Sequence, residues 1–139
     1  DTTWDDIEPL TVPWPENLRR RTRHVTTEIA RVHAAVAALR QGDFAQMGGL
    51  MAESHASLDA DYQVSSEELN TMVALARQLP GLYGARMTGG GFGGCTVNLV
   101  HVDEAEAFAA ELARRYQNIT GRWPEIYLCR SSDGATEVS

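Results

Sequence analysis

The sequence has no lysine, because all 12 of its basic residues are arginine. A Walker P-loop and a protein-kinase nucleotide site each place a lysine on the phosphates of the nucleotide. The absence of lysine therefore excludes both of these phosphate-binding sites from the chain.

Cysteine and long apolar stretches are also scarce. The chain has two cysteines, Cys95 and Cys129, no signal-like start and no apolar run of membrane length. These features are typical of a cytoplasmic protein without membrane contact, in which we expect both cysteines to be buried free thiols. The net charge of -7 argues against a nucleic-acid partner, because the phosphate backbone attracts basic surfaces.

The length of 139 residues fits one domain, which is short for a complete enzyme with two substrates. The chain begins at Asp1 without a methionine, so we expect it to be a fragment of a longer protein. Residues 1–14 are acidic and have no clear period, which predicts an irregular tail with a short strand over residues 10–14.

Glycine is concentrated in one stretch. Residues 88–95 contain five of the 12 glycines and lie between two strand-like runs, residues 83–88 and 95–100. This pattern predicts a β-hairpin with an open tip, because glycine adopts positive φ and lets backbone N–H groups approach a ligand. A simple hairpin turn needs only one or two glycines, so we favour a loop near phosphate or substrate over a plain turn. Its members are Gly89, Gly90, Gly91, Phe92, Gly93 and Gly94.

The same letters fit the pattern G-x-G-x-x-G, which also marks a dinucleotide site. That site needs a helix directly after the glycines, because the pyrophosphate binds at the helix N-terminus. Residues 95–100 alternate and are rich in β-branched side chains, which is typical of a strand. We therefore reject the dinucleotide site. For a loop that lines an active site, valine at Gly91 should lower activity far more than stability.

Residues 15–60 predict an antiparallel pair of helices. Apolar residues recur every three or four positions, Gly42 ends the first helix and Asp43 caps the second. The short connection requires the two helices to run antiparallel. The apolar face of the first helix consists of Leu18, Val25, Ile29, Val32, Val36 and Leu39.

Residues 65–135 predict the order helix, strand, strand, helix, strand. Ser65 and Glu68 form a capping box at the start of this unit, and residues 125–130 supply its last strand. The order is that of a split βαβ, or ferredoxin-like, unit that lacks an obvious first strand. We therefore predict an α+β fold, in which an antiparallel sheet carries helices on one face and follows the helix pair.

Polar side chains cluster on the second helix, where Ser54 and His55 are candidates for a nucleophile and its base. Adjacent residues of a helix point about 100° apart, so these two cannot readily share a proton. We expect them to hydrogen-bond a neighbouring loop instead. His24 and Glu28 lie one helical turn apart, but no third ligand is evident, which favours a solvated pair over a metal site. We assign no catalytic residue and no metal ligand to this chain.

The glycine stretch and four other segments resemble, in the same order, the motifs of galactokinases. These enzymes belong to the galactose, homoserine, mevalonate and phosphomevalonate kinase family. The resemblance covers about residues 18–135, and the setting of Met87 and Phe92 is closer to galactokinase than to mevalonate kinase. The matching segments are residues 21–25, 53–58, 61–65, 84–97 and 132–135.

This resemblance implies that the chain is the C-terminal domain of a sugar kinase. The whole enzyme would transfer the γ-phosphate of ATP to the C1 hydroxyl of galactose, and residues 89–94 would lie at its cleft with Ser54 and His55 as candidate neighbours. The resemblance assigns the sugar pocket, the catalytic base and most of the ATP and Mg²⁺ site to an N-terminal half. The implied partners are that half, galactose and ATP, and the isolated chain should be inactive.

Two other functions stay open at this point: a non-catalytic, galactokinase-like sensor of sugar and nucleotide, and a related sugar kinase. In each case the chain is part of a larger protein and should expose an apolar patch where the other half docks. We expect this patch on the first two helices or near Trp4 and Trp14.

Overall fold

The computed structural model describes residues 2–131, so the motif at residues 132–135 lies outside the described residues. The chain begins with a short helix, α1 (Trp4–Ile7), and a 3₁₀ helix, η1 (Glu8–Thr11). The predicted irregular tail and its strand over residues 10–14 are therefore wrong. Pro9 lies in the first turn of η1, where its fixed φ favours a helix, and the buried Thr11 hydroxyl donates to the Glu8 carbonyl at 2.8 Å.

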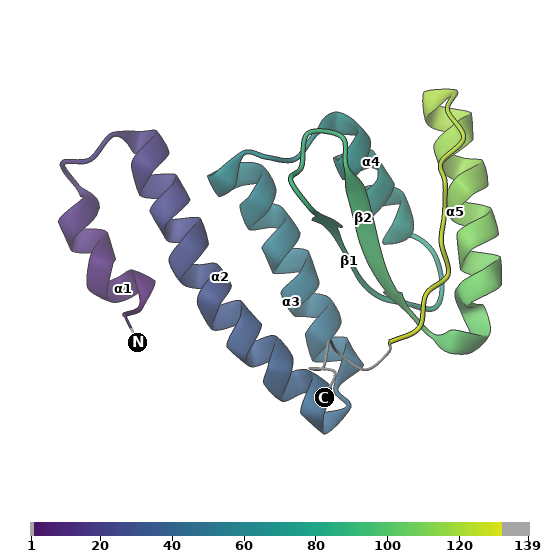
Figure 1. Cartoon of the computed structure of the whole chain (residues 1–139), viewed down its shortest axis with the longest axis horizontal. Coiled ribbons are helices and arrows are strands. Elements are labelled where there is room, and N and C mark those ends of the chain that lie inside the picture. Colours follow the sequence, from purple (N-terminus) through teal and green to yellow (C-terminus); the bar gives the residue numbers. More distant parts are fainter. Residues whose placement is uncertain (1, 132–139) are drawn as a thin grey trace, which may run out of the picture.

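The two long helices form as predicted. α2 (Glu16–Gln41) ends where Gly42 adopts φ of 69°, a left-handed conformation that glycine reaches without strain. α3 (Phe44–Ser57) begins at Asp43, whose carboxylate accepts from the Gln46 amide at 2.9 Å. The two helices lie side by side and run antiparallel (Figure 1).

A single π-helical turn, η2 (Leu58–Tyr62), leads from α3 towards α4 (Glu67–Ala76). The cap of α4 is Ser66, whose hydroxyl accepts from the Leu69 amide at 3.3 Å, and not Ser65 as predicted. Ser65 donates to the side-chain oxygen of Asn70 at 2.6 Å. Two adjacent serines offer the same capping group, so the sequence pattern placed the helix start one residue too early.

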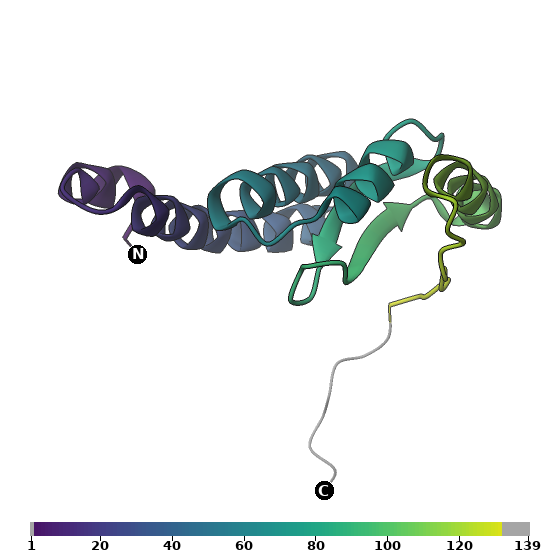
Figure 2. The same ribbon diagram turned by 90° about the horizontal axis from the view of Figure 1, so that it is seen from above.

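The sheet has two antiparallel strands within the described residues, β1 (Leu82–Thr88) and β2 (Cys95–Val100). Thr88 pairs with Cys95, and Ala85 pairs with Asn98. Helices α3 and α4 lie on one side of this sheet (Figure 2). The predicted α+β class, an antiparallel sheet with helices on one face after a helix pair, is confirmed.

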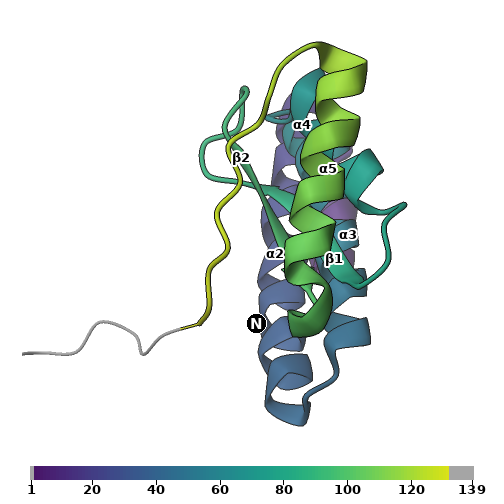
Figure 3. The ribbon, with the colours of Figure 1, turned by 90° about the vertical axis from the view of Figure 1, so that its right-hand side faces the viewer.

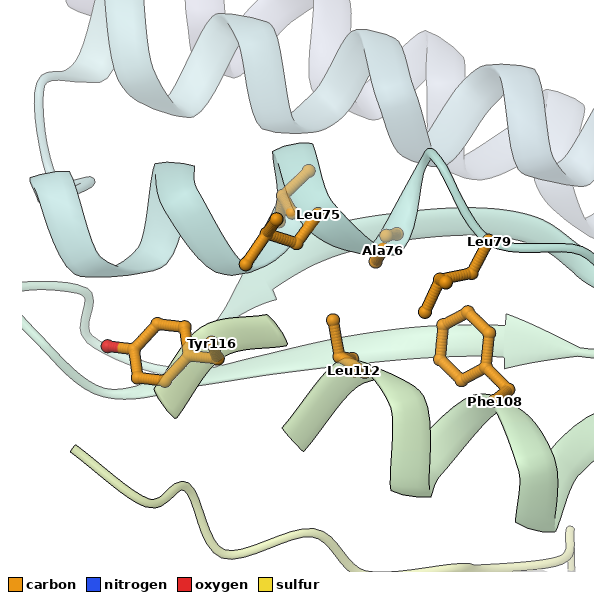
Figure 4. Close-up of a cluster of buried hydrophobic side chains, with 8 residues drawn as sticks. Leu75, Ala76, Leu79, Phe108, Leu112 and Tyr116 are labelled. Atoms are coloured by element: carbon orange, nitrogen blue, oxygen red, sulfur yellow. The ribbon is translucent and has the colours of Figure 1, made fainter. Parts of the chain in front are cut away.

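The main core lies between α4, the sheet and the last helix, α5 (Ala105–Thr120). Phe108 and Leu112 of α5 point towards Ala76, the last residue of α4, and Leu79, which follows that helix (Figure 4). Burial of each large side chain contributes roughly 1.5–3 kcal/mol, so this cluster holds the hairpin against the two helices. Its other members are Val73, Leu75, Ala85 and Tyr116.

The predicted third strand, over residues 125–130, does not form. Residues 122–131 follow α5 as an extended trace without regular secondary structure (Figure 3). A strand requires a backbone partner, and no backbone hydrogen bond within residues 2–131 joins this segment to β2. The strand pattern of the sequence is therefore not realised within the described residues.

The apolar face of α2 is exposed. Its six large apolar side chains, which we term the α2 stripe, are each 43–55% exposed. The expected apolar patch on the first helix pair is thus present. No helix within residues 2–131 is long and apolar enough to cross a membrane. The α2 stripe consists of Leu18, Val25, Ile29, Val32, Val36 and Leu39.

Candidate functional site

The glycine loop, residues 89–94, joins β1 to β2 through a backbone that favours glycine. Gly89 and Gly91 have φ of 77°, Gly93 has φ of 93°, and Phe92 has φ of 53°. Left-handed backbone costs roughly 1–2 kcal/mol for a residue with a Cβ atom, because that atom approaches the following carbonyl. The conformation alone therefore accounts for three of the five glycines.

Gly91 is packed against another segment of the chain. The Phe92 amide donates to the Val64 carbonyl at 2.9 Å, and a Cβ atom on Gly91 would overlap that same carbonyl. The missing side chain thus lets the loop lie directly on the segment before α4. A valine at Gly91 should therefore lower stability as well as activity, because both the positive φ and the Val64 contact exclude a side chain.

The other face of the loop is open. Gly89, Gly90 and Gly93 are exposed, and no atom lies within 4 Å of a Cβ atom added at any of them. The Phe92 side chain is 77% exposed. This face is free to approach a ligand or another protein surface closely, as backbone N–H groups without side chains allow.

Ser54 and His55 hold the strand that leads into the loop. His55 is buried, and its Nδ1 accepts from the Met87 amide at 3.2 Å. Ser54 points elsewhere: it donates to the Glu28 carboxylate at 2.6 Å and accepts from Arg86 at 2.9 Å. As the helix geometry predicts, the two side chains do not share a proton. Each has a partner in the strand β1, Arg86 for Ser54 and Met87 for His55, and not in a loop as we expected.

The surroundings of His55 disfavour its protonated form. Burial lowers its pKa and the charges of Arg77 and Arg86 lower it further, while the carboxylate of Asp59 opposes them. Because Nδ1 accepts from the backbone of Met87, the single ring proton lies on Nε2.

Glu28 is the centre of an ionic cluster that the sequence did not predict. Its carboxylate accepts from Ser54, from Arg31 at 2.8 Å and from Arg86 at 3.1 Å. Burial raises the pKa of Glu28, but the hydrogen bonds from Ser54 and Arg31 and the charges of both arginines outweigh it and hold this pKa below its ordinary value. The cluster joins α2, α3 and β1 next to the glycine loop. The only sequence signal was an arginine within an otherwise apolar strand.

The predicted solvated pair of His24 and Glu28 is wrong, because His24 is buried. Ser57 donates its hydroxyl proton to Asp61 at 3.0 Å, so it accepts from His24 Nδ1 at 3.0 Å. The His24 ring also stacks on Tyr62, with centroids 4.7 Å apart. Burial lowers the pKa of His24 despite the nearby carboxylates of Glu28 and Asp61. Contacts between α2 and the end of α3 create this environment, which local spacing does not reveal.

The described residues contain no metal centre. Within residues 2–131, no group of three His, Cys, Asp or Glu side chains could hold a metal ion. A groove of about 320 Å³ lies on α2, between His24 and His33. Cys95 and Cys129 are free thiols as predicted, but both are exposed and not buried.

Comparisons with known proteins give consistent matches. The C-terminal domain model of the GHMP kinases matches residues 35–118. A galactokinase of Roseiflexus sp. strain RS-1 is 52% identical over 138 residues, which are 99% of this chain and 35% of the relative. A galactokinase of Homo sapiens is 52% identical over 84% of this chain and 29% of the relative. The chain thus spans about a third of the length of the curated relatives it matches.

Solved structures agree with these matches. A Lactococcus lactis galactokinase complexed with galactose superposes with a TM-score of 0.82 and 36% identity, covering 88% of this chain and 32% of that chain. An L. major mevalonate kinase in complex with R-mevalonate gives a TM-score of 0.63 at 23% identity, covering 86% and 37%, which is a likeness of fold alone. The family model runs from α2 to α5 and includes the helices and the hairpin that carry the glycine loop. The chain therefore belongs to the GHMP kinase family, named after galactose, homoserine, mevalonate and phosphomevalonate kinases, and it carries the C-terminal domain of that family.

Proposed function

We propose that this chain is the C-terminal domain of a galactokinase, which transfers the γ-phosphate of ATP to the C1 hydroxyl of galactose. The observation that carries this proposal is the identity of 52% to galactokinases from a bacterium and from Homo sapiens over most of the chain. The structural likeness to a galactokinase complexed with galactose supports the same substrate.

In this proposal the glycine loop is one wall of the active-site cleft. Gly89, Gly90 and Gly93 present bare backbone on the open face of the loop, which suits close approach of phosphate or sugar. Ser54 and His55 act behind that wall, because they fix Arg86 and Met87 at the end of β1. Phosphoryl transfer depends mainly on positioning and charge neutralisation. A glycine loop held in one position by β1 would help to position the substrates.

The remaining parts of the reaction belong to the N-terminal half of the same enzyme. The described residues offer no cluster of ligands for Mg²⁺, and the chain has no lysine for the nucleotide phosphates. We therefore assign the catalytic base, the Mg²⁺ ligands and most of the ATP contacts to that half. The α2 stripe is the apolar surface on which it docks, since six half-exposed aliphatic side chains on one helix are unusual for a free surface.

Within the chain, we divide this domain into residues 1–14, which carry α1 and η1, the helix pair of residues 15–60, and the hairpin unit of residues 65–135. A cytoplasmic location follows from the galactokinase assignment and suits the two free, exposed thiols.

The test uses the chain alone and a joined kinase, in which the chain follows the N-terminal two-thirds of the Roseiflexus galactokinase. A coupled assay of galactose phosphorylation should give no turnover for the chain alone. The joined kinase should turn over within the usual enzyme range of about 1–10³ s⁻¹. A joined kinase that folds but does not phosphorylate galactose contradicts the proposal, and so does turnover by the chain alone.

A further inference from the structure

The backbone of Met87 turns both of its hydrogen-bonding groups away from β2. In an antiparallel ladder, the N–H and C=O groups of one residue point to the same edge of the strand. The Met87 amide donates to His55 Nδ1 at 3.2 Å, and the Met87 carbonyl accepts from Arg86 Nε at 3.0 Å. Two side chains therefore satisfy the outer edge of β1 at Met87, two residues before the glycine loop begins.

Arg86 reaches this carbonyl and two helices at once. Its Nη1 donates to Ser54 Oγ at 2.9 Å and to the Glu28 carboxylate at 3.1 Å, while its Nε donates to Met87. The N–H groups of a guanidinium are coplanar and fixed in direction, so three acceptors on different elements define one orientation of the side chain. The side chains of Arg86 and Glu28 are 31% and 21% exposed, so much of this network is shielded from water.

The acceptors of Arg86 are themselves fixed. Ser54 is 2% exposed, and its hydroxyl proton goes to Glu28 at 2.6 Å, which leaves its lone pairs for Arg86. The other carboxylate oxygen of Glu28 accepts from Arg31 Nε at 2.8 Å. Each hydrogen bond orients the next, and the network thus ties the Met87 carbonyl to α2 and α3.

Glu28 lies on α2, the helix that carries the α2 stripe. It lines the groove on that helix together with Ile29 and Val32, two members of the stripe. In the proposed galactokinase, this surface meets the N-terminal half, to which we assign the catalytic base and the Mg²⁺ ligands. The network therefore connects the glycine loop to the helix on which that half docks, and it fixes the loop relative to the reacting groups.

We propose that Arg86 is a positioning residue for phosphoryl transfer, which acts with Glu28 and Ser54 to hold the glycine loop against the substrates. This proposal rests on the galactokinase assignment for the reaction. Arg86 acts through the Met87 carbonyl, at the point where β1 enters the loop. A displacement of about 1 Å in a positioned group costs about 10²-fold in rate, so loss of this guanidinium lowers kcat without unfolding the domain.

Arg86→Lys separates the charge of the side chain from its geometry. Lysine retains the positive charge beside Glu28, but its ammonium group is a single point that cannot reach Glu28 and the Met87 carbonyl together. In the joined kinase, the Tm should change by about 4 °C or less. The kcat should fall at least about tenfold, with KM for galactose and for ATP within about threefold of the original values. Full kcat in Arg86→Lys would reduce the network to an ion pair and overturn the proposal.

Arg86→Met and Arg31→Met form a matched pair. Both remove one arginine from Glu28, but within the described residues the side-chain hydrogen bonds of Arg31 go only to Glu28 and Thr27 of α2. In the joined kinase, Arg86→Met should lower kcat by about 10–10²-fold and Arg31→Met by about threefold or less. Equal losses of kcat would make the cluster a general support of the fold and overturn the proposal.

Amide hydrogen exchange of the chain alone tests the network without the reaction. The Phe92 and Gly94 amides donate to backbone carbonyls within the chain, so their exchange reports on opening of the loop. Both should exchange at least about fivefold faster in Arg86→Met than in the unchanged chain and in Arg31→Met. The amides of α5 are the internal control, because a general loss of stability would speed their exchange as well.

The two sets of measurements distinguish this proposal from the proposed function. Equal exchange of the loop amides in all three proteins overturns the role of Arg86, even when the joined kinase is active. An inactive joined kinase without substitutions contradicts the galactokinase assignment. Faster loop exchange in Arg86→Met would still support Arg86 as the residue that holds the loop.

Discussion

The Met87 amide donates to His55 Nδ1 at 3.2 Å, so a backbone group of β1 is held by a side chain of α3. The bond requires a ring without a proton on Nδ1. Met87 is only two residues from the glycine loop, and the position of the loop therefore depends on the protonation state of a buried histidine.

This contact predicts loss of stability in acid. The folded-state pKa of His55 is lowered, chiefly by burial and then by Arg77, so the stabilising contribution is complete above the unfolded pKa of about 6.5. It is lost as pH falls below that value towards the folded pKa, because the unfolded chain then binds more protons. The Tm of the chain should fall between pH 7.5 and pH 5.

The variant His55→Asn separates this effect from other titrations. The amide oxygen of asparagine can accept from Met87 at every pH, so the decrease of Tm below pH 6.5 should become shallower. It should not vanish, because the pKa of His24 is also lowered by burial. An unchanged slope would mean that His55 does not titrate with folding.

Two adjacent glycines of α3 should respond in opposite ways to alanine. A Cβ atom on Gly48 would overlap the Tyr83 carbonyl of β1, whereas no atom lies within 4 Å of one on Gly49. Gly48→Ala should destabilise the chain by about 1–3 kcal/mol through overpacking. Gly49→Ala should stabilise it by about 0.5–1 kcal/mol, because alanine favours the helix. Urea unfolding of both variants decides the matter, and equal effects would refute the close contact of α3 and β1.

Gly90 is the position that tests the glycine loop as a cleft wall. It does not have positive φ and has open space around it, so Gly90→Val should change the stability by no more than about 0.5 kcal/mol. In the joined kinase it should lower kcat/KM by orders of magnitude, because the valine side chain occupies space that the substrates approach. Gly91→Val is the contrasting variant: its strain of about 1–3 kcal/mol should appear in the Tm of the chain alone. Normal kinetics for Gly90→Val would show that the open face is not part of the site.

The α2 stripe should be neutral for the chain and essential for the joined kinase. Ile29→Gln and Val32→Gln replace side chains that are 52% and 55% exposed, so each should alter the unfolding free energy of the chain by about 0.5 kcal/mol or less. Both should reduce self-association of the chain in sedimentation experiments and lower the Tm of the joined kinase. Ala37→Gln, on exposed α2 surface beside the stripe, serves as the control. Equal effects of all three variants would argue against a docking surface.

Local signals predicted most of the fold. Gly42 and Asp43 define the break between α2 and α3 through φ and a side-chain cap, and both effects act within a few residues. The glycine-rich hairpin could likewise be predicted from residues that are close together in the sequence. The cap at Ser65 was one residue out, because neighbouring serines present equivalent hydroxyls to the same helix end.

Contacts between distant segments account for what the sequence did not predict. His24 is buried by residues about 33 positions away in the chain, through Ser57, and no spacing rule encodes such a contact. The contact of Gly91 with Val64 also joins segments that are distant in the sequence, so no spacing rule predicts it. A strand over residues 125–130 depends on a backbone partner from a distant segment, and none pairs with it within the described residues. The periodicity of α2 predicted a helix without revealing what covers its apolar face.

The contact of Gly91 with Val64 has a consequence for compensating mutations. The nearest atoms at position 64 belong to its carbonyl group, which every amino acid carries. A smaller residue at position 64 therefore cannot make room for a side chain at position 91. A selection for second-site suppressors of Gly91 variants should recover changes that move the whole segment before α4, or true revertants, but no change of side chain at position 64.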